Sequence, residues 1–279
     1  MEKNDKNLFK ILLLLGLSAL LLVSAVLEGY TSYLTGYLMA FFAAVLAGSM
    51  VTAFTICTVH IVGLILFGFV IGFLTQAIGI TSDLWCYDCT FIFAAFSWSL
   101  AAVTMEGISR IIQYRLKSLR DPPLNVLMIL ALLATLLVTL ALQDHLKYAK
   151  YRPAPEAWKK KQESGIQDTC FINQGMPEKG SEQFKWKLEP NEPFWIYYIS
   201  LAGFAILMQA RIPFTQLLSL ILAAWIMGGI SEWMGATARL WHFRTEAFPP
   251  LFLVLGCWPL EFLVIRGLAT RLKGSVVLQ

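Results

Sequence analysis

The chain has 279 residues, of which 57% are hydrophobic and only 14% are charged, and its formal net charge is +4. Charged residues make up about 25% of an average soluble domain, so a chain this apolar cannot cover its surface with polar groups and a soluble single domain is excluded. Aromatic residues at 13% and only 5 cysteines exclude collagen, a disordered chain and a disulfide scaffold. No concentrated basic face is present, so nucleic acid is not an expected partner.

Apolar runs along the chain predict eight transmembrane helices. The bilayer core offers the backbone no water, so a span needs roughly 20 mostly apolar residues. Such runs occur at about 9–28, 35–56, 60–80, 90–112, 124–142, 193–210, 213–233 and 247–268. The stretch 35–80 is too long for one helix and should form a hairpin that turns near Thr55–Thr58. The predicted fold class is therefore an all-α polytopic membrane protein.

The first apolar run also has the features of a secretory signal peptide. Lys3, Lys6 and Lys10 lie at its start, and the segment 23–25 provides a small-x-small cleavage motif. Because the sequence from Met1 still contains this segment, we expect it to be retained as the first helix of the bundle.

The distribution of Lys and Arg predicts the orientation, because short cytoplasmic loops carry an excess of these residues. Most Lys and Arg residues of the termini and short loops fall on one predicted side of the membrane. They are Lys3, Lys6, Lys10, Arg110, Arg115, Lys117, Arg120, Arg211, Arg266, Arg271 and Lys273. The loops 28–36 and 82–89 on the other side contain none, and Arg239 and Arg244 are the exceptions. Both termini are therefore predicted to be cytoplasmic, in a protein of the plasma membrane.

The chain repeats itself at an offset of 156 residues, which carries Trp85 to Trp241. The motif Gln-x-x-Gly-x-Thr-x-x-Leu-Trp-x-Tyr at 76–87 matches Glu-x-x-Gly-x-Thr-x-x-Leu-Trp-x-Phe at 232–243. A basic motif, Arg-x4-Arg-Leu-Lys, occurs at 110–117 and again at 266–273. A shared spacing of Gly, Thr, Trp and Arg does not follow from apolar composition alone. The sequence therefore predicts a duplicated core of three helices.

The duplication predicts how the chain is divided. Residues 1–123 are expected to form a first four-helix repeat, whose repeated core is at about 35–117. A fifth helix at 124–142 and an insertion at 143–192 follow, and residues 193–279 form the second repeat core. Equivalent helices run in the same direction, so the repeats are parallel and related by an axis along the membrane normal. The insertion is too polar to span a membrane and is expected to be an extracytoplasmic cap or a docking surface for a protein partner.

Glu261 is the first candidate catalytic residue, because it lies well inside the last predicted span. A carboxylate in hydrocarbon is costly, so an intramembrane acid is by default a functional candidate. Burial favours its protonated form, which can act as a general acid toward a hydrophobic substrate. The alternative is a structural role, in which Glu261 pairs with Arg266 or hydrogen-bonds a neighbouring helix.

Glu106 and Glu232 are the other two candidate acids. Glu106 lies four residues before Arg110, so the two share one helix face and a structural ion pair is the favoured interpretation. Glu232 lies at the outer end of the seventh span, where Gln76 occupies the matching position of the first repeat. Two interpretations follow. The repeats have diverged and Glu232 belongs to the one active site, or Glu232 lies at a helix end exposed to solvent.

Aromatic residues near the outer interface are candidate substrate-binding residues: Trp85, Tyr87, Trp241, Phe243 and, inside the last span, Trp258. Aromatic belts explain most such residues, but not an identical spacing from Gly79 and Gly235. Their π faces can stabilise a carbocation. His242 lies between two of them, and the sequence contains no His pair or His–carboxylate cluster at ligand spacing, so no metal site is expected.

Cys86 and Cys89 form a CxxC motif at the outer start of the fourth span, and Cys170 lies in the insertion on the same side. A membrane thiol oxidoreductase would use such a motif, but it usually needs a second cysteine pair. A structural disulfide that tethers the insertion, or free thiols, is the favoured interpretation.

In the second repeat, Trp-x-Phe at 241–243 is followed by a glycine-containing stretch and by Pro-Leu-Glu at 259–261. This order resembles the motif of the lycopene cyclase domain family, whose members are three-helix membrane modules that form the rings at the ends of linear carotenoids. The family has a second Glu where this chain has Phe262, and the first repeat lacks Pro-Leu-Glu.

The resemblance implies a cyclisation without redox change. Glu261 would donate a proton to a terminal double bond, while Trp241, Phe243 and Trp258 would shield the resulting cation. No cofactor is implied, and the expected partners are membrane lipids and an isoprenoid or pigment ligand.

Two other functions stay open. The chain can be a non-catalytic pigment- or lipid-binding subunit of a larger membrane complex, with 143–192 as its docking surface and Phe262 as a sign of lost catalysis. It can also be a transporter, since parallel repeats are common there, but only Pro259 with Glu261 suggests the broken helix that transport requires.

Overall fold

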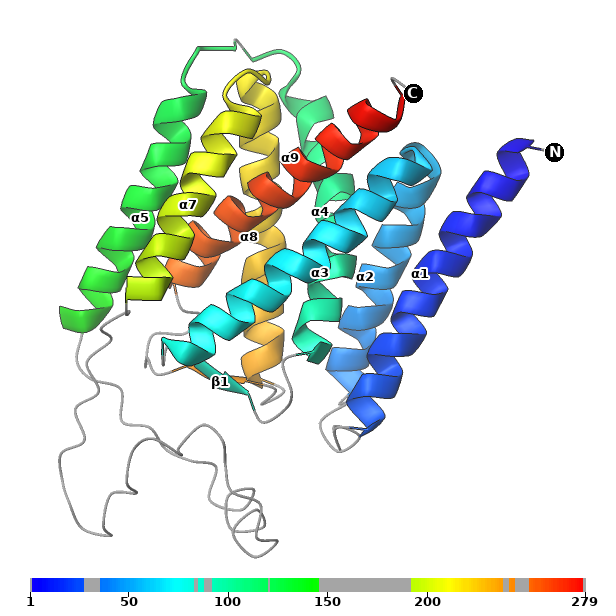
Figure 1. Cartoon of the computed structure of the whole chain (residues 1–279), viewed down its shortest axis with the longest axis horizontal. Coiled ribbons are helices and arrows are strands. Elements are labelled where there is room, and N and C mark those ends of the chain that lie inside the picture. The colour runs from blue at the N-terminus through cyan, green and yellow to red at the C-terminus, as the bar shows by residue number, and fades with distance from the viewer. Residues whose placement is uncertain are drawn as a thin grey trace, which may run out of the picture.

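The computed structural model describes residues 2–27, 36–82, 85–87, 92–119, 121–145, 192–237, 241–243 and 251–277 (Figure 1). Almost all of these residues are helical, which confirms the predicted helical class. Most of the predicted insertion, together with Cys89 and Cys170, lies outside the described residues.

Eight α-helices, one π-helical segment and two short strands make up the described part of the chain. The first half contains α1 (Glu2–Leu27), α2 (Gly36–Thr55), α3 (Thr58–Thr81), β1 (Trp85–Tyr87) and α4 (Ile92–Leu116). The second half contains α5 (Asn125–His145), α7 (Glu192–Gln209), α8 (Phe214–Thr237), β2 (Trp241–Phe243), η3 (Leu253–Cys257) and α9 (Trp258–Val277). The predicted hairpin turn is confirmed, because α2 ends at Thr55 and α3 begins at Thr58.

Three helical segments of the described chain are long and apolar enough to cross a membrane: Thr58–Thr81, Phe214–Gly235 and Leu253–Ser275. Shorter apolar helical stretches occur at Asn7–Val23, Ala40–Thr55 and Asn125–Leu140. The structure therefore supports a helical membrane protein with three such helices, and the full number of eight spans stays a prediction.

The last helix is displaced from its predicted position. Hydropathy placed the span at about 247–268, whereas η3 and α9 continue the helix to Val277. Hydropathy marks apolar residues and not the hydrogen-bonded end of a helix. Arg271 and Lys273 are good helix formers, so the helix extends through them beyond the apolar segment.

The bounds of the elements repeat at the offset found in the sequence. α3 and α8 begin at residues 58 and 214 and end at residues 81 and 237, and β1 and β2 keep the same spacing of 156. The third core helices, α4 and the helix formed by η3 and α9, are described from residues 92 and 251 on, and the residues just before them lie outside the described part of the chain. The second of these helices contains the π-helical segment η3, which accommodates an extra residue within a helical turn. The division of the chain into repeat domains stays a prediction that these bounds favour.

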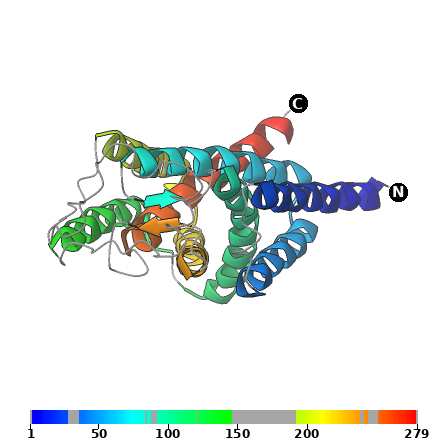
Figure 2. The same cartoon turned by 90° about the horizontal axis from the view of Figure 1, so that it is seen from below.

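The two halves pack through their core helices. α3 lies against α9 and α4 lies against α8, so each core covers its apolar faces with helices of the other. Within the halves, α2 packs on α4 and α7 packs on α9, with α1 and α5 at the two sides (Figure 2). Both termini lie at one end of the bundle and β1 lies at the other, which is the arrangement expected of parallel repeats (Figure 1).

The two Trp-x-aromatic motifs form a small antiparallel sheet. β1 pairs with β2 so that Trp85 lies opposite Phe243, Tyr87 lies opposite Trp241, and Cys86 lies opposite His242. Residues that match at the offset of 156 therefore pair about a local two-fold axis. The sequence analysis did not predict strands here, because three residues are too few to show an alternating pattern.

Lys10 attaches α1 to the bundle. This lysine of the signal-like segment is buried, and its Nζ donates hydrogen bonds to the backbone oxygens of Ala53 and Ile56, at 2.9 and 2.7 Å. These carbonyls lie at the end of α2, where helices leave backbone acceptors without intrahelical partners. The side chain thus neutralises a helix end and holds α1 in place.

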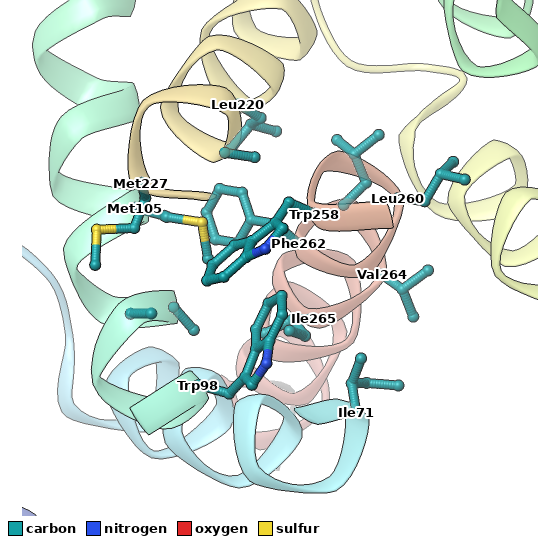
Figure 3. Packing of buried hydrophobic residues seen from close by; sticks show 14 of the residues in the cluster. Ile71, Trp98, Met105, Leu220, Met227, Trp258, Leu260, Phe262, Val264 and Ile265 are labelled. Atoms are coloured by element: carbon teal, nitrogen blue, oxygen red, sulfur yellow. The ribbon is translucent and has the colours of Figure 1, made fainter. Parts of the chain in front are cut away.

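Two tryptophans meet at the centre of the core. The rings of Trp98 on α4 and Trp258 on α9 are stacked, with centroids 4.0 Å apart and planes inclined by 24° (Figure 3). Each ring lies on a glycine of the neighbouring core helix. A Cβ atom at Gly72 would lie 2.5 Å from the Trp98 Cβ, and one at Gly228 would lie 2.6 Å from the Trp258 Cγ.

Replacing either glycine should destabilise the bundle. We expect Gly72→Ala and Gly228→Ala each to cost about 1–3 kcal/mol, because the new methyl group overpacks a rigid indole. Gly203→Ala on α7 is the matched control, since no atom lies within 4 Å of its Cβ position. Thermal denaturation of the purified protein in detergent measures the effect. Equal melting temperatures for all three variants would contradict the close packing.

Cysteine labelling can establish the orientation. We expect a Cys at exposed Glu192, where α7 begins, to react with a membrane-impermeant maleimide added outside intact cells. A Cys at exposed Lys117, just after α4, should react only after the cells are permeabilised. The native cysteines are removed first. The reverse pattern would overturn the assignment of both termini to the cytoplasm.

Candidate functional site

Glu261 lies at the meeting point of three helices. It is the fourth residue of α9, and its side chain is fully buried. Its Oε1 accepts a hydrogen bond of 2.7 Å from the Tyr198 hydroxyl on α7 and one of 2.8 Å from the Thr75 Oγ1 on α3. Within the described residues no Lys or Arg pairs with it, so a Glu261–Arg266 pair is not found, whereas the other form of the structural alternative, hydrogen bonds to neighbouring helices, is present.

The second carboxyl oxygen of Glu261 has a different environment. Oε2 is buried and has no hydrogen-bond partner among the described residues. In a protonated carboxyl, one oxygen accepts hydrogen bonds and the other carries the proton. An ionised carboxylate would be costly here, because no cation compensates it. The geometry therefore suits a neutral acid that accepts at Oε1 and carries a transferable proton at Oε2.

Two more hydroxyl contacts continue from Glu261 along α3. Thr75 Oγ1 lies 2.9 Å from the hydroxyl of Tyr197, which also donates a 3.3 Å hydrogen bond to the Ile71 backbone oxygen. The sequence analysis missed Thr75, Tyr197 and Tyr198. A signal was present, because at the repeat offset the tyrosines correspond to Phe41 and Phe42, so two hydroxyls distinguish the second half.

Glu232 is buried, which corrects the interpretation of a solvated helix end. Only 7% of its surface is exposed, and its Oε1 accepts a 2.7 Å hydrogen bond from the Trp258 Nε1. The face of α8 that carries Glu232 is covered by neighbouring helices, which hydropathy alone does not reveal. Gln76, its counterpart, is buried as well. The hydrogen bond from Trp258 fixes the indole orientation three residues before Glu261.

Glu106 belongs to a separate, cationic cluster. Its Oε1 accepts a 3.0 Å hydrogen bond from the Arg110 Nε, which confirms the expected i,i+4 pair. The same oxygen lies 3.6 Å from the His60 Nε2, and Oε2 lies 3.7 Å from the Arg266 Nε. Arg266 also donates to the Gln209 Oε1 at 3.4 Å. Glu106 thus joins α3, α4 and α9 through His60, Arg110 and Arg266, whereas Glu261 is bonded to hydroxyls.

The remaining site residues predicted from the sequence are placed only by their backbones. The strand residues are Trp85, Cys86, Tyr87, Trp241, His242 and Phe243. The sheet brings them together, but their side chains are outside what the structure describes, so their contacts with a substrate stay predictions. The same holds for a disulfide among the cysteines Cys86, Cys89 and Cys170. Among the described residues, no group of three His, Cys, Asp or Glu side chains could hold a metal ion.

No protein-family model, curated protein or solved structure matches this chain.

The cationic cluster should carry much of the stability of the interface between halves. Glu106→Gln leaves Arg266 and His60 buried without a carboxylate, and breaking a buried pair in this way costs about 3–5 kcal/mol. Arg110→Gln removes only a half-exposed partner and should cost about 0–1 kcal/mol. Chemical denaturation in detergent compares the two variants. A Glu106→Gln protein as stable as Arg110→Gln would show that the cluster contributes little.

Proposed function

We propose that this protein is a membrane-embedded acid catalyst that isomerises an apolar isoprenoid-type substrate, with Glu261 as the proton donor. The observation that carries the proposal is the environment of Glu261. This carboxyl is fully buried, receives only hydroxyl hydrogen bonds at Oε1, and has a second oxygen without a partner among the described residues. The resemblance of the segment 241–261 to lycopene cyclase modules suggests the ends of linear carotenoids as the substrate class.

The reaction needs no change of oxidation state. Glu261 transfers the Oε2 proton to a terminal carbon–carbon double bond, and the resulting cation is attacked by a neighbouring double bond of the same chain. The ring closes, and the Glu261 carboxylate takes back one proton from an adjacent carbon, which forms the product double bond and restores the acid. One proton enters and one leaves, so the product has the mass of the substrate.

The surroundings of Glu261 suit such a cation. The Trp258 indole is hydrogen-bonded to Glu232, stacked on Trp98 and packed on Gly228, so its ring is fixed near Glu261 but its faces are covered, and Trp241 and Phe243 are left as the residues proposed to shield the cation. An aromatic face attracts a cation without offering a nucleophile, and this attraction strengthens when water is absent. The strand β2 places the backbones of Trp241 and Phe243 at the end of the bundle where α9 begins.

A second candidate is a non-catalytic pigment- or lipid-binding subunit. The observation that favours it is Phe262, which is fully buried where the resembling family has its second Glu. In this case the hydrogen bonds of Glu261 serve to join α3, α7 and α9.

The test uses bacteria that accumulate lycopene. We expect the wild-type chain to convert lycopene into products of equal mass with shorter-wavelength absorption, separated by liquid chromatography. Glu261→Gln keeps the shape of the side chain but has no transferable proton, so it should abolish conversion with a normal yield of folded protein. Glu192→Gln, the same change at an exposed site, should convert lycopene as the wild type does.

Two outcomes would reject the catalytic proposal. Lycopene that co-purifies unchanged with the wild-type protein would support the binding subunit. A Glu261→Gln protein that retains conversion would show that another group donates the proton.

A further inference from the structure

The helix that carries Glu261 is broken just before this residue. In an α-helix, the N–H of each residue donates to the carbonyl four residues earlier. Pro259 has no N–H, so the backbone oxygen of Leu255 cannot receive the usual bond from it. The turn at this point is π-helical, and the Trp258 N–H bonds to the Leu253 oxygen instead of to a carbonyl four residues away.

Trp225 on α8 supplies the missing donor. Its Nε1 donates a 3.2 Å hydrogen bond to the Leu255 backbone oxygen, which is the acceptor that Pro259 leaves. A proline is tolerated within a membrane helix where a neighbouring helix satisfies the freed backbone group. Trp225 lies midway along α8, whereas the tryptophans of membrane proteins gather at the two interfaces. An aromatic belt therefore does not account for Trp225, and the broken turn does.

At matching positions the first half has neither the proline nor the indole. At the offset of 156, Trp225 corresponds to Phe69, which keeps an aromatic ring without an N–H. The Phe69 ring packs on the Phe96 ring of α4, with centroids 5.0 Å apart. α4 contains no proline and is α-helical from Ile92 to Leu116. Aromatic packing needs only the ring, so the indole N–H occurs in the half where a proline removes a backbone donor.

The broken turn decides where the following side chains point. One extra residue in a turn rotates the side chains after it by about 100° relative to those of an uninterrupted α-helix. Glu261 lies in the first turn of α9, and its Oε1 meets the hydroxyls of Thr75 and Tyr198 at 2.8 and 2.7 Å. Such short contacts require the broken turn to keep one geometry. Trp225 of α8 bonds to this turn, and α5 packs on η3 as well.

We propose that Trp225 is a positioning residue for Glu261, which it directs by holding the broken turn at the Leu255 carbonyl. This inference deepens the proposed function and rests on it, because Glu261 is the proton donor there. Trp225 acts through the backbone and takes no part in the proton transfer. Without its N–H, the turn is free to adopt other geometries, and the Glu261 carboxyl moves relative to Thr75 and Tyr198.

Infrared spectroscopy of the purified protein in lipid tests this proposal without a substrate. The band of Glu261, as a carboxyl or as a carboxylate, is the one that Glu261→Gln removes, and its position depends on the hydrogen bonds that the group accepts. Trp225→Phe keeps an aromatic ring and removes the N–H, so we expect it to shift this band. Trp233→Phe, the same change at an exposed position of α8, is the matched control and should leave the band unchanged.

Pro259→Ala separates positioning from packing. It returns a backbone N–H to position 259, which then donates to the Leu255 carbonyl in place of Trp225. Within the Pro259→Ala background, Trp225→Phe should therefore cause no further band shift and no further fall in melting temperature. If Trp225→Phe alone yields no folded protein, the addition of Pro259→Ala should restore folding, and a failure to restore it would contradict the proposal.

Three further results would overturn the positioning role. Trp225→Phe could leave the Glu261 band in place, Trp233→Phe could shift it as much, or Trp225→Phe could have an equal effect in the Pro259→Ala background.

The band and the conversion of lycopene distinguish this inference from the cyclase proposal. A band shift in Trp225→Phe, with a wild-type protein that converts no lycopene, would support the positioning and reject the cyclase. Conversion by the wild type with an unchanged band in Trp225→Phe would do the reverse. Where the wild type converts lycopene, Trp225→Phe should be slower by up to about a hundredfold, the loss expected when a catalytic group is misplaced by about 1 Å. An unchanged rate would contradict the proposal.

Discussion

The packing of each three-helix core against the other is the constraint on which the rest of this structure depends. α3 covers α9 and α4 covers α8, and the stacked rings of Trp98 and Trp258 occupy the centre. Glycines at 72 and 228 allow each ring to approach the neighbouring helix backbone. A core separated from its partner would expose these faces, so the two halves stabilise each other and neither has a complete interior alone.

This interface buries acids in two different environments. Glu106 is surrounded by Arg266, Arg110 and His60, so its charge is compensated and its removal would leave cations unpaired. Glu261 has hydroxyl partners and no cation among the described residues, so a neutral carboxyl costs less there than a charged one. The same residue type therefore serves as an ionic link in one place and as a candidate acid in the other.

The two halves differ by small changes at positions that match at the offset of 156. At matching positions the first half has Phe41, Phe42 and Gln76, and the second has Tyr197, Tyr198 and Glu232. The added oxygens hydrogen-bond to Glu261, to Thr75 and to Trp258, all around one end of α9. The helices of the first half supply Thr75 and the stacked Trp98, so the candidate site needs both halves although the acid comes from one.

The sequence by itself determined the helical class, the turn between α2 and α3, the offset of 156 and the Glu106–Arg110 pair, because composition, periodicity and i,i+4 spacing act over short distances along the chain. It could not determine how many helices cross a membrane, since polar residues facing a packed interior and polar residues facing water have the same hydropathy. The tertiary structure alone decided the pairing of β1 with β2, the burial of Glu232 and the partners of Glu261. Thr75 and Glu261 are 186 residues apart, and such contacts depend on how whole helices pack against one another.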